Sequence, residues 1–113
     1  MDIYVNGIKF EDEALKCLSE ERTEGLQATA RMTVDPDEKS FIYLLDDGEG
    51  AGRVHFGEKT WRMLRDHHGS EIILNTDVIL TDFWDQLDHL VDTIEGNSYG
   101  EAFERAVKET FKQ

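Results

Sequence analysis

The sequence predicts an α+β fold: an antiparallel β-sheet of hairpins and a meander, with one middle helix and a C-terminal helical pair packed on it. Apolar runs of strand length recur through residues 3–80, interrupted by one helical stretch, and two stripes of helical period follow in residues 81–111. The chain has 113 residues, of which 39% are hydrophobic. This size and composition suit one core, so we expect residues 1–113 to form a single domain.

The first predicted element is an N-terminal hairpin. Asn6-Gly7 is a dipeptide typical of a two-residue hairpin turn. A turn at this point gathers four apolar side chains on one face: Ile3, Val5, Ile8 and Phe10. A continuous strand would divide them between two faces, so we expect the hairpin.

Residues 11–21 are compatible with two structures. Their glutamate, alanine, leucine and lysine residues favour a helix. Residues 14–18 equally suit a strand that follows a turn at Asp12-Glu13. Helix and strand therefore both stay open for this segment.

Residues 26–45 predict two strands. Apolar side chains alternate from Leu26 to Val34, which is the period of a strand buried on one face, and residues 35–38 end it with the turn sequence Asp-Pro-Asp-Glu. Residues 41–45 are apolar on both faces, which predicts a central strand.

Residues 46–80 predict a strand, the middle helix and a second hairpin. The acidic, glycine-rich residues 46–52 indicate a turn. After it we expect a strand at residues 53–56, a helix at residues 58–68 closed by Gly69, and a hairpin of residues 71–74 and 78–80.

The first C-terminal helix is predicted by a single apolar stripe: Phe83, Leu87, Leu90, Val91 and Ile94. Thr81 or Asp82 suits its N-cap, and Asp85 occupies the N3 position behind an Asp82 cap. We expect the helix to stop at Gly96 in a left-handed C-terminal cap.

The second C-terminal helix follows a short joint at residues 96–100. Ser98 and Glu101 have the spacing of a capping box. The apolar stripe of this helix comprises Ala102, Phe103, Ala106, Val107 and Phe111. A joint of this length favours a helical hairpin or a sharp corner, with both stripes turned toward one core.

Charge and cysteine content limit the partners and the compartment. A formal net charge of -13 argues against direct binding of nucleic acid or of an anionic membrane, and it permits a basic protein partner. The single cysteine, Cys17, fits a reducing compartment, and residues 1–4 lack the features of a signal peptide. We expect a cytoplasmic protein; its oligomeric state is left open.

Metal and catalytic motifs are weak. The acidic residues 46–52 lack the ligand spacing of an EF-hand, so a turn is favoured. Asp85, Asp88 and Asp92 lie on one helical side without histidines at matching positions on a second helix, which favours a solvated acidic face. The four histidines and Cys17 show no zinc-site spacing. We expect no catalytic residue, no metal and no cofactor.

The candidate interaction surface combines these acids with two aromatic residues: Trp84, Asp85, Asp88, Asp92 and Tyr99. Trp84 lies beside the apolar stripe of its helix and not in its centre. We therefore expect Trp84 at the rim of the core, facing a groove or a partner.

One segment carries a family resemblance. Residues 94–101, with the sequence Ile-Glu-Gly-Asn-Ser-Tyr-Gly-Glu, together with residues 41–45, Trp61 and Leu64, resemble the uncharacterised YjbL-like family of small acidic proteins from Bacillus-type bacteria. The likeness covers residues 28–111 and is most specific at the glycine-rich joint. It implies a cytosolic bacterial protein, and it carries over no catalytic or binding residues.

Two functions fit the sequence. The first is a noncatalytic protein-interaction or regulatory module whose acidic surface engages a basic partner, or imitates nucleic acid. The second is a small-ligand-binding protein or minor enzyme that uses a cleft between sheet and helices. Glycine-rich phosphate loops, nucleophile elbows and paired-cysteine motifs are absent from the sequence, which favours the first function.

Overall fold

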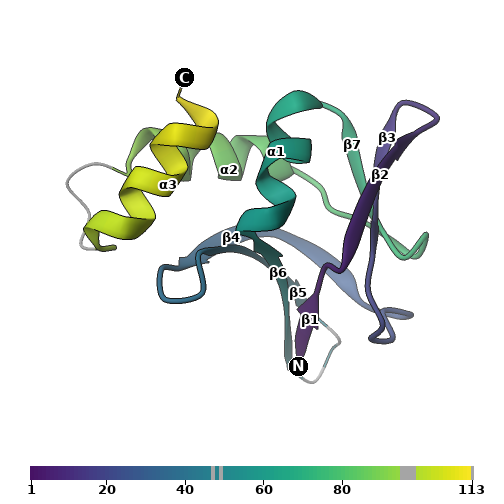
Figure 1. Ribbon diagram of the computed structural model, residues 1–113. Coiled ribbons are helices and arrows are strands. Elements are labelled where there is room, and N and C mark those ends of the chain that lie inside the picture. The colour runs from purple at the N-terminus through teal and green to yellow at the C-terminus, as the bar shows by residue number, and fades with distance from the viewer. Residues whose placement is uncertain (47, 49, 95–98, 113) are drawn as a thin grey trace.

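The computed structural model describes residues 1–46, 48, 50–94 and 99–112. In chain order its elements are β1 (Asp2–Tyr4), β2 (Gly7–Glu11), β3 (Ala14–Leu18), β4 (Gln27–Asp35), β5 (Ser40–Asp46), β6 (Ala51–Gly57), α1 (Glu58–Asp66), β7 (Glu71–Leu74), β8 (Val78–Ile79), α2 (Phe83–Asp92) and α3 (Glu101–Phe111). The strands form two sheets, with the orders β1-β6-β5-β4 and β2-β3-β7-β8. The three helices lie along one side of the first sheet, with the second sheet beside them (Figure 1).

The predicted α+β fold is confirmed, and most strand pairs are antiparallel as expected. Each sheet also contains one parallel pair, β1 with β6 and β3 with β7. These pairs join segments far apart in the sequence, so neither was visible as a local pattern. Both sheets are therefore mixed.

The hairpin predicted at Asn6-Gly7 is wrong. At this point the chain passes from one sheet to the other: the Val5 amide donates to the His55 carbonyl at 3.2 Å, and the Asn6 amide donates to the Leu18 carbonyl at 2.8 Å. The two-residue turn lies instead at Asp12-Glu13, between β2 and β3. Pairing with strands on both sides outweighed the turn preference of the dipeptide.

The Asp12-Glu13 turn decides the segment that the sequence left open. Both residues have positive φ, 54° and 64°, as a two-residue hairpin turn requires when it matches the right-handed twist of its strands. Residues 14–18 form a strand, β3, in which Leu15 and Cys17 are fully buried. The strand alternative is therefore confirmed over the helix.

The predicted central strand is confirmed. β5 lies between β4 and β6, and each of its apolar residues is buried except the half-buried Leu44. β4 follows the predicted alternation at Met32 and Val34, after a register shift between Ala28 and Met32 in which Ala30 has a φ of 59°. The buried Tyr43 hydroxyl accepts from the Ala30 amide at 3.0 Å and donates to the Thr81 carbonyl at 2.6 Å, so it joins the bulge to the start of α2.

The middle helix and the second hairpin form, but α1 ends at Asp66 with His67 as its C-cap, so the predicted end at His68 with closure by Gly69 is wrong. α1 buries Trp61 and Leu64, and the Trp61 indole nitrogen donates to the Phe56 carbonyl at 2.9 Å. β7 and β8 pair antiparallel across a turn in which Asn75 and Thr76 have positive φ. The Asn75 side chain also accepts from the Ser19 amide at 2.7 Å, which ties this turn to the end of β3.

The caps of the two C-terminal helices differ from the prediction. Asp82 does precede α2, but its φ is 55° and its side chain caps no backbone amide, so the capping box with Asp85 is wrong. The left-handed cap predicted at Gly96 lies outside the described residues, as does Ser98. α3 begins at Glu101 with Gly100, at a φ of 97°, in the N-cap position that was predicted for Ser98.

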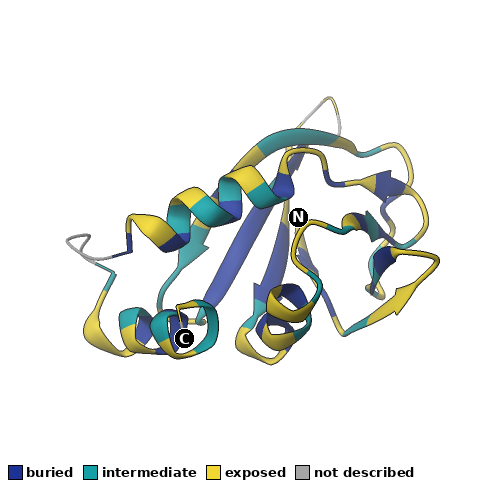
Figure 2. Cartoon of the chain, turned by 90° about the horizontal axis from the view of Figure 1, so that it is seen from above, coloured by how far each residue is buried: buried dark blue, intermediate teal, exposed yellow. Residues whose placement is uncertain are grey.

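The core is an aromatic cluster between the first sheet and the helices. Phe41 contacts Trp61 and Phe103 at ring-centroid distances of 5.2 and 5.9 Å, and Phe56 contacts Phe83 at 5.1 Å. The central strands are buried along most of their length, and the helices alternate between buried and exposed sides (Figure 2). The predicted stripes supply these buried sides except at three positions: Leu90 and Phe111 are half-buried and Ala102 is exposed.

Candidate functional site

The structure divides the five predicted interaction residues among three places. Trp84 and Asp85 line a groove beside the start of α2. Asp88 and Asp92 line a second hollow, where α2 approaches the C-terminal ends of α1 and α3. Tyr99 lines neither of these two hollows and packs edge-on against Phe103, with ring centroids 6.0 Å apart. The predicted residues therefore do not line one groove, although His68 contacts both Trp84 and Asp88.

Trp84 is half-buried at the rim of the core, as expected from its place beside the apolar stripe. Its indole nitrogen donates to the Ser70 carbonyl at 2.6 Å. One neighbour, Phe83, meets the ring edge-on at 5.1 Å, and the imidazole of His68 lies 4.6 Å from it. These contacts hold the indole in one orientation, which lowers the entropy lost when a partner packs on it.

The Trp84 groove combines apolar and acidic side chains. Its volume is about 370 Å³, and its lining includes Ile79, Trp84 and three carboxylates, those of Glu71, Asp82 and Asp85. Ile79 is 50% exposed on the short edge strand β8. All three carboxylates are exposed, and none forms an ion pair with a residue that the structure describes. A basic, partly aliphatic segment has matching chemistry.

Asp88 lies about one turn after Asp85 on α2 and already has a partner. Its two carboxylate oxygens lie 2.8 and 2.9 Å from His68 Nε2, which connects α1 to α2. The hollow around this pair has a volume of about 480 Å³, and Arg65, Asp92 and Lys112 also line it. Asp88 is thus less available to a basic partner than Asp85.

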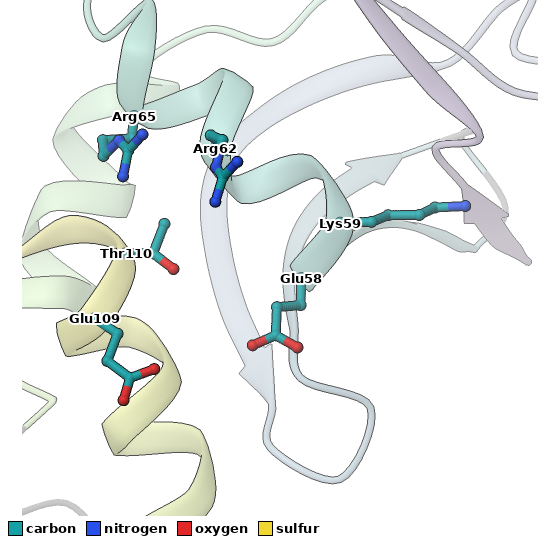
Figure 3. A pocket seen from close by; sticks show the side chains of 6 residues that line it. All are labelled: Glu58, Lys59, Arg62, Arg65, Glu109 and Thr110. Atoms are coloured by element: carbon teal, nitrogen blue, oxygen red, sulfur yellow. The ribbon is translucent and has the colours of Figure 1, made fainter.

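A third groove separates α1 from α3. Its volume is about 600 Å³, and its lining comprises Glu58, Lys59, Arg62, Arg65, Glu109 and Thr110. Arg62 and Arg65 extend from α1 toward Thr110 on α3, whereas Lys59 points away from the groove (Figure 3). This Arg62 groove was not predicted, although two arginines three residues apart on a predicted helix indicate a basic helical side.

Cys17 and His55, two residues with reactive side chains, are buried away from these grooves. Burial raises the pKa of the Cys17 thiol to about 12, so it stays protonated at neutral pH. His55 Nε2 lies 2.9 Å from Asp2 Oδ1, and the Tyr4 ring stacks on the imidazole at 4.5 Å. The hydrogen bond with His55 lowers the pKa of Asp2. Neither arrangement exposes a nucleophile beside a base.

The described part of the chain holds neither a metal-ligand cluster nor a membrane-spanning helix. No three histidine, cysteine, aspartate or glutamate residues there come together in a way that could hold a metal ion. No described helix has the length and apolar content required to cross a membrane. The alternative function required a ligand cleft between the sheet and the helices. Aromatic side chains fill the layer between the first sheet and the helices.

Comparison with known proteins places the chain in a bacterial family. A family model described as UPF0738, a family of unknown function, matches residues 3–111. A UPF0738 protein of Staphylococcus haemolyticus is 44% identical over 98% of this chain and 97% of its own length. Similar proteins of Staphylococcus epidermidis and Staphylococcus aureus are 43% and 39% identical, over 99% and 98% of this chain and 98% and 97% of their own lengths. No solved structure matches the chain.

These matches agree with the sequence resemblance at one level. A bacterial family of unknown function was expected and is confirmed; the matching family carries the name UPF0738 and not YjbL-like, and the relatives compared here are staphylococcal. Because the family model spans nearly the whole chain and the relatives match it end to end, the chain belongs to the UPF0738 family.

Proposed function

We propose that this protein is a noncatalytic interaction module that binds a basic segment of a partner protein in the Trp84 groove. The observation that carries the proposal is the pairing of an oriented indole with three exposed carboxylates, none of them paired to a described cation. Lysine and arginine side chains match both features, because their aliphatic stems pack on apolar surface while their charged ends meet carboxylates.

The same groove supports a protein partner over direct nucleic-acid binding. Phosphate backbones would meet the carboxylates of Glu71, Asp82 and Asp85 and a chain of net charge -13. A cytoplasmic location belongs to this proposal and is supported by the lone cysteine, Cys17, which is buried as a free thiol.

Capture from a staphylococcal lysate tests the proposal. The double variant Glu71→Gln/Asp85→Asn should capture about tenfold less of a basic partner, because the charges that attract the partner are removed. The matched control is Asp37→Asn/Asp92→Asn, which removes the same charge from exposed positions outside the groove. Raising the salt concentration should weaken capture by the wild type more than capture by the groove variant.

A second pair of variants tests the apolar part of the groove. Ile79→Thr should reduce capture, since it removes exposed apolar surface from the groove. Leu18→Thr is the control, because Leu18 is similarly exposed, at 49%, on β3. Equal capture by all four variants would show that the acids serve solubility alone.

A further inference from the structure

The Arg62 groove holds a cation, Arg62, that has no ion-pair partner among the residues that the structure describes. Arg62 is exposed, and its guanidinium forms no ion pair with a residue that the structure describes. Glu58 lies one helical turn before Arg62 and Glu109 lies across the groove, yet neither carboxylate is within ion-pair distance of it. A glutamate and an arginine four residues apart on a helix commonly form an ion pair. Glu58 and Arg62 do not form one here, so no ion pair between them covers the groove.

Arg65 adds a second guanidinium to the same side. Its Nε and one terminal nitrogen both lie 3.0 Å from Asp66 Oδ1, which holds the side chain and leaves further N–H donors unused. Across the groove, the hydroxyl of Thr110 lies between the two arginines and Glu109 (Figure 3). Two guanidinium groups and a hydroxyl thus line the same groove.

We propose that this groove binds a small soluble phosphate ester that carries free hydroxyl groups. Arg62 and Arg65 present planar, multidentate donors that match phosphate oxygens, and the Thr110 hydroxyl adds another donor. Glu109 accepts hydrogen bonds only, so it suits the hydroxyl groups of the ester and opposes a second phosphate. The site is separate from the Trp84 groove, and it does not rest on the partner proposed there.

The negative net charge of the chain limits the kind of phosphate compound that can bind, but it does not prevent a small one from binding in the groove. At physiological ionic strength charges farther away than about 8 Å are largely screened, so the potential inside the groove depends on its own lining, in which Arg62 and Arg65 stand with Glu58 and Glu109. A membrane of anionic lipid would face the whole surface of a chain with a net charge of -13, which repels it. A small ester meets only the groove.

An NMR titration at physiological ionic strength tests the assignment with three probes: glucose 6-phosphate, inorganic phosphate and glucose. Glucose 6-phosphate should shift the signals of Arg62 and Arg65 saturably, and glucose should not. Arg62→Gln and Arg65→Gln should each weaken binding by about tenfold, because each removes a charge-assisted hydrogen bond. Arg22→Gln is the matched control: Arg22 is exposed outside the groove, so this variant should bind like the wild type.

Glu109→Gln tests separately how the phosphate group and the hydroxyl groups of the proposed ligand contribute to binding. It should tighten binding of inorganic phosphate, since a repelling charge is removed, and reduce the preference for glucose 6-phosphate over phosphate. Equal weakening by Arg22→Gln, or no saturable shift with any phosphate, would overturn the proposal. Binding to vesicles of phosphatidic acid and phosphatidylcholine in place of glucose 6-phosphate would overturn it as well.

Discussion

At the scale of single residues, Cys17 illustrates how burial sets reactivity. The side chain is fully buried on the inner side of β3, in contact with the main core cluster. Its pKa of about 12 leaves almost no thiolate at neutral pH, and the thiolate is the reactive form. A buried, protonated thiol packs in this cluster as a small apolar side chain.

The raised pKa predicts a loss of stability in alkali. Because the folded-state pKa of Cys17 lies above the ordinary value of 9.0, its contribution is complete below pH 9.0 and is lost as the pH rises toward 12. The free energy of unfolding should fall by about 1.4 kcal/mol per pH unit in that window. Urea titrations at successive pH values would measure the slope. Cys17→Ala should be less stable at neutral pH but lack this component, and an unchanged slope in the variant would contradict the assignment.

At the scale of elements, the sharp turn between β8 and α2 prevents the usual N-cap at the start of the helix. Asp82 occupies the N-cap position with positive φ because the chain turns sharply from β8 into α2. That conformation prevents the extended geometry in which an aspartate side chain caps a helix. Phe83 and Leu87 are buried as a result of this entry angle.

This geometry predicts opposite outcomes for two substitutions of aspartate by glycine. Asp82→Gly should stabilise the protein by about 0.5 kcal/mol, because glycine adopts positive φ without a steric cost and no capping bond is lost. Asp85→Gly, with the same change in charge, should cost about 1 kcal/mol in the first turn of α2. Thermal melts of both variants would compare them. A loss of stability in Asp82→Gly would mean that the side chain does cap the helix.

Elements were predictable from the sequence where local chemistry and long-range pairing agree. The alternation before Val34 and the apolar residues 41–45 predicted β4 and the central strand β5, because burial on one or two faces leaves a direct pattern. The hairpin prediction at Asn6-Gly7 was wrong because the turn preference of this dipeptide is weaker than the pairing of the chain with strands on both sides. The pairing of β1 with β6 has no local signature at all.

The candidate site was predictable to a smaller extent. Trp84 could be placed at the rim because its position on the helix follows from periodicity alone. Glu71 and Ile79 could not be added to it, since their approach to α2 depends on how β7 and β8 pack. Arg62 looked like an ordinary solvated helix position until α3 supplied the facing side of its groove.

At the scale of the whole molecule, charge is distributed unevenly over neighbouring helices. The nine residues of α1 include three cations, Lys59, Arg62 and Arg65, whereas the charged side chains of α2 are the carboxylates of Asp85, Asp88 and Asp92. Basic and acidic grooves thus lie close together on a strongly acidic protein. The chain has 25 acidic residues and 12 basic ones, so acids outnumber the cations that could pair with them and folding brings like charges together.

This repulsion predicts that moderate salt stabilises the protein. Sodium chloride shortens the screening length from about 30 Å at 0.01 M to about 10 Å at 0.1 M, which reduces repulsion in the folded state more than in the expanded chain. The melting temperature should rise over this range. Asp37→Asn/Asp92→Asn should show a smaller rise, because two of the repelling charges are gone. A melting temperature that falls with added salt would show that attractive pairs dominate.

The two parallel strand pairs also determine the order in which a growing chain can assemble. During synthesis β1 and β3 leave the ribosome long before β6 and β7, the strands beside which they lie in the finished sheets. The β2–β3 hairpin can form early, but an isolated two-stranded hairpin is at best marginally stable in water. Leu15 and Cys17 stay exposed on the nascent chain until the later strands emerge. The N-terminal strands are made first, but β1 and β3 gain these neighbours only after β6 and β7 have been made.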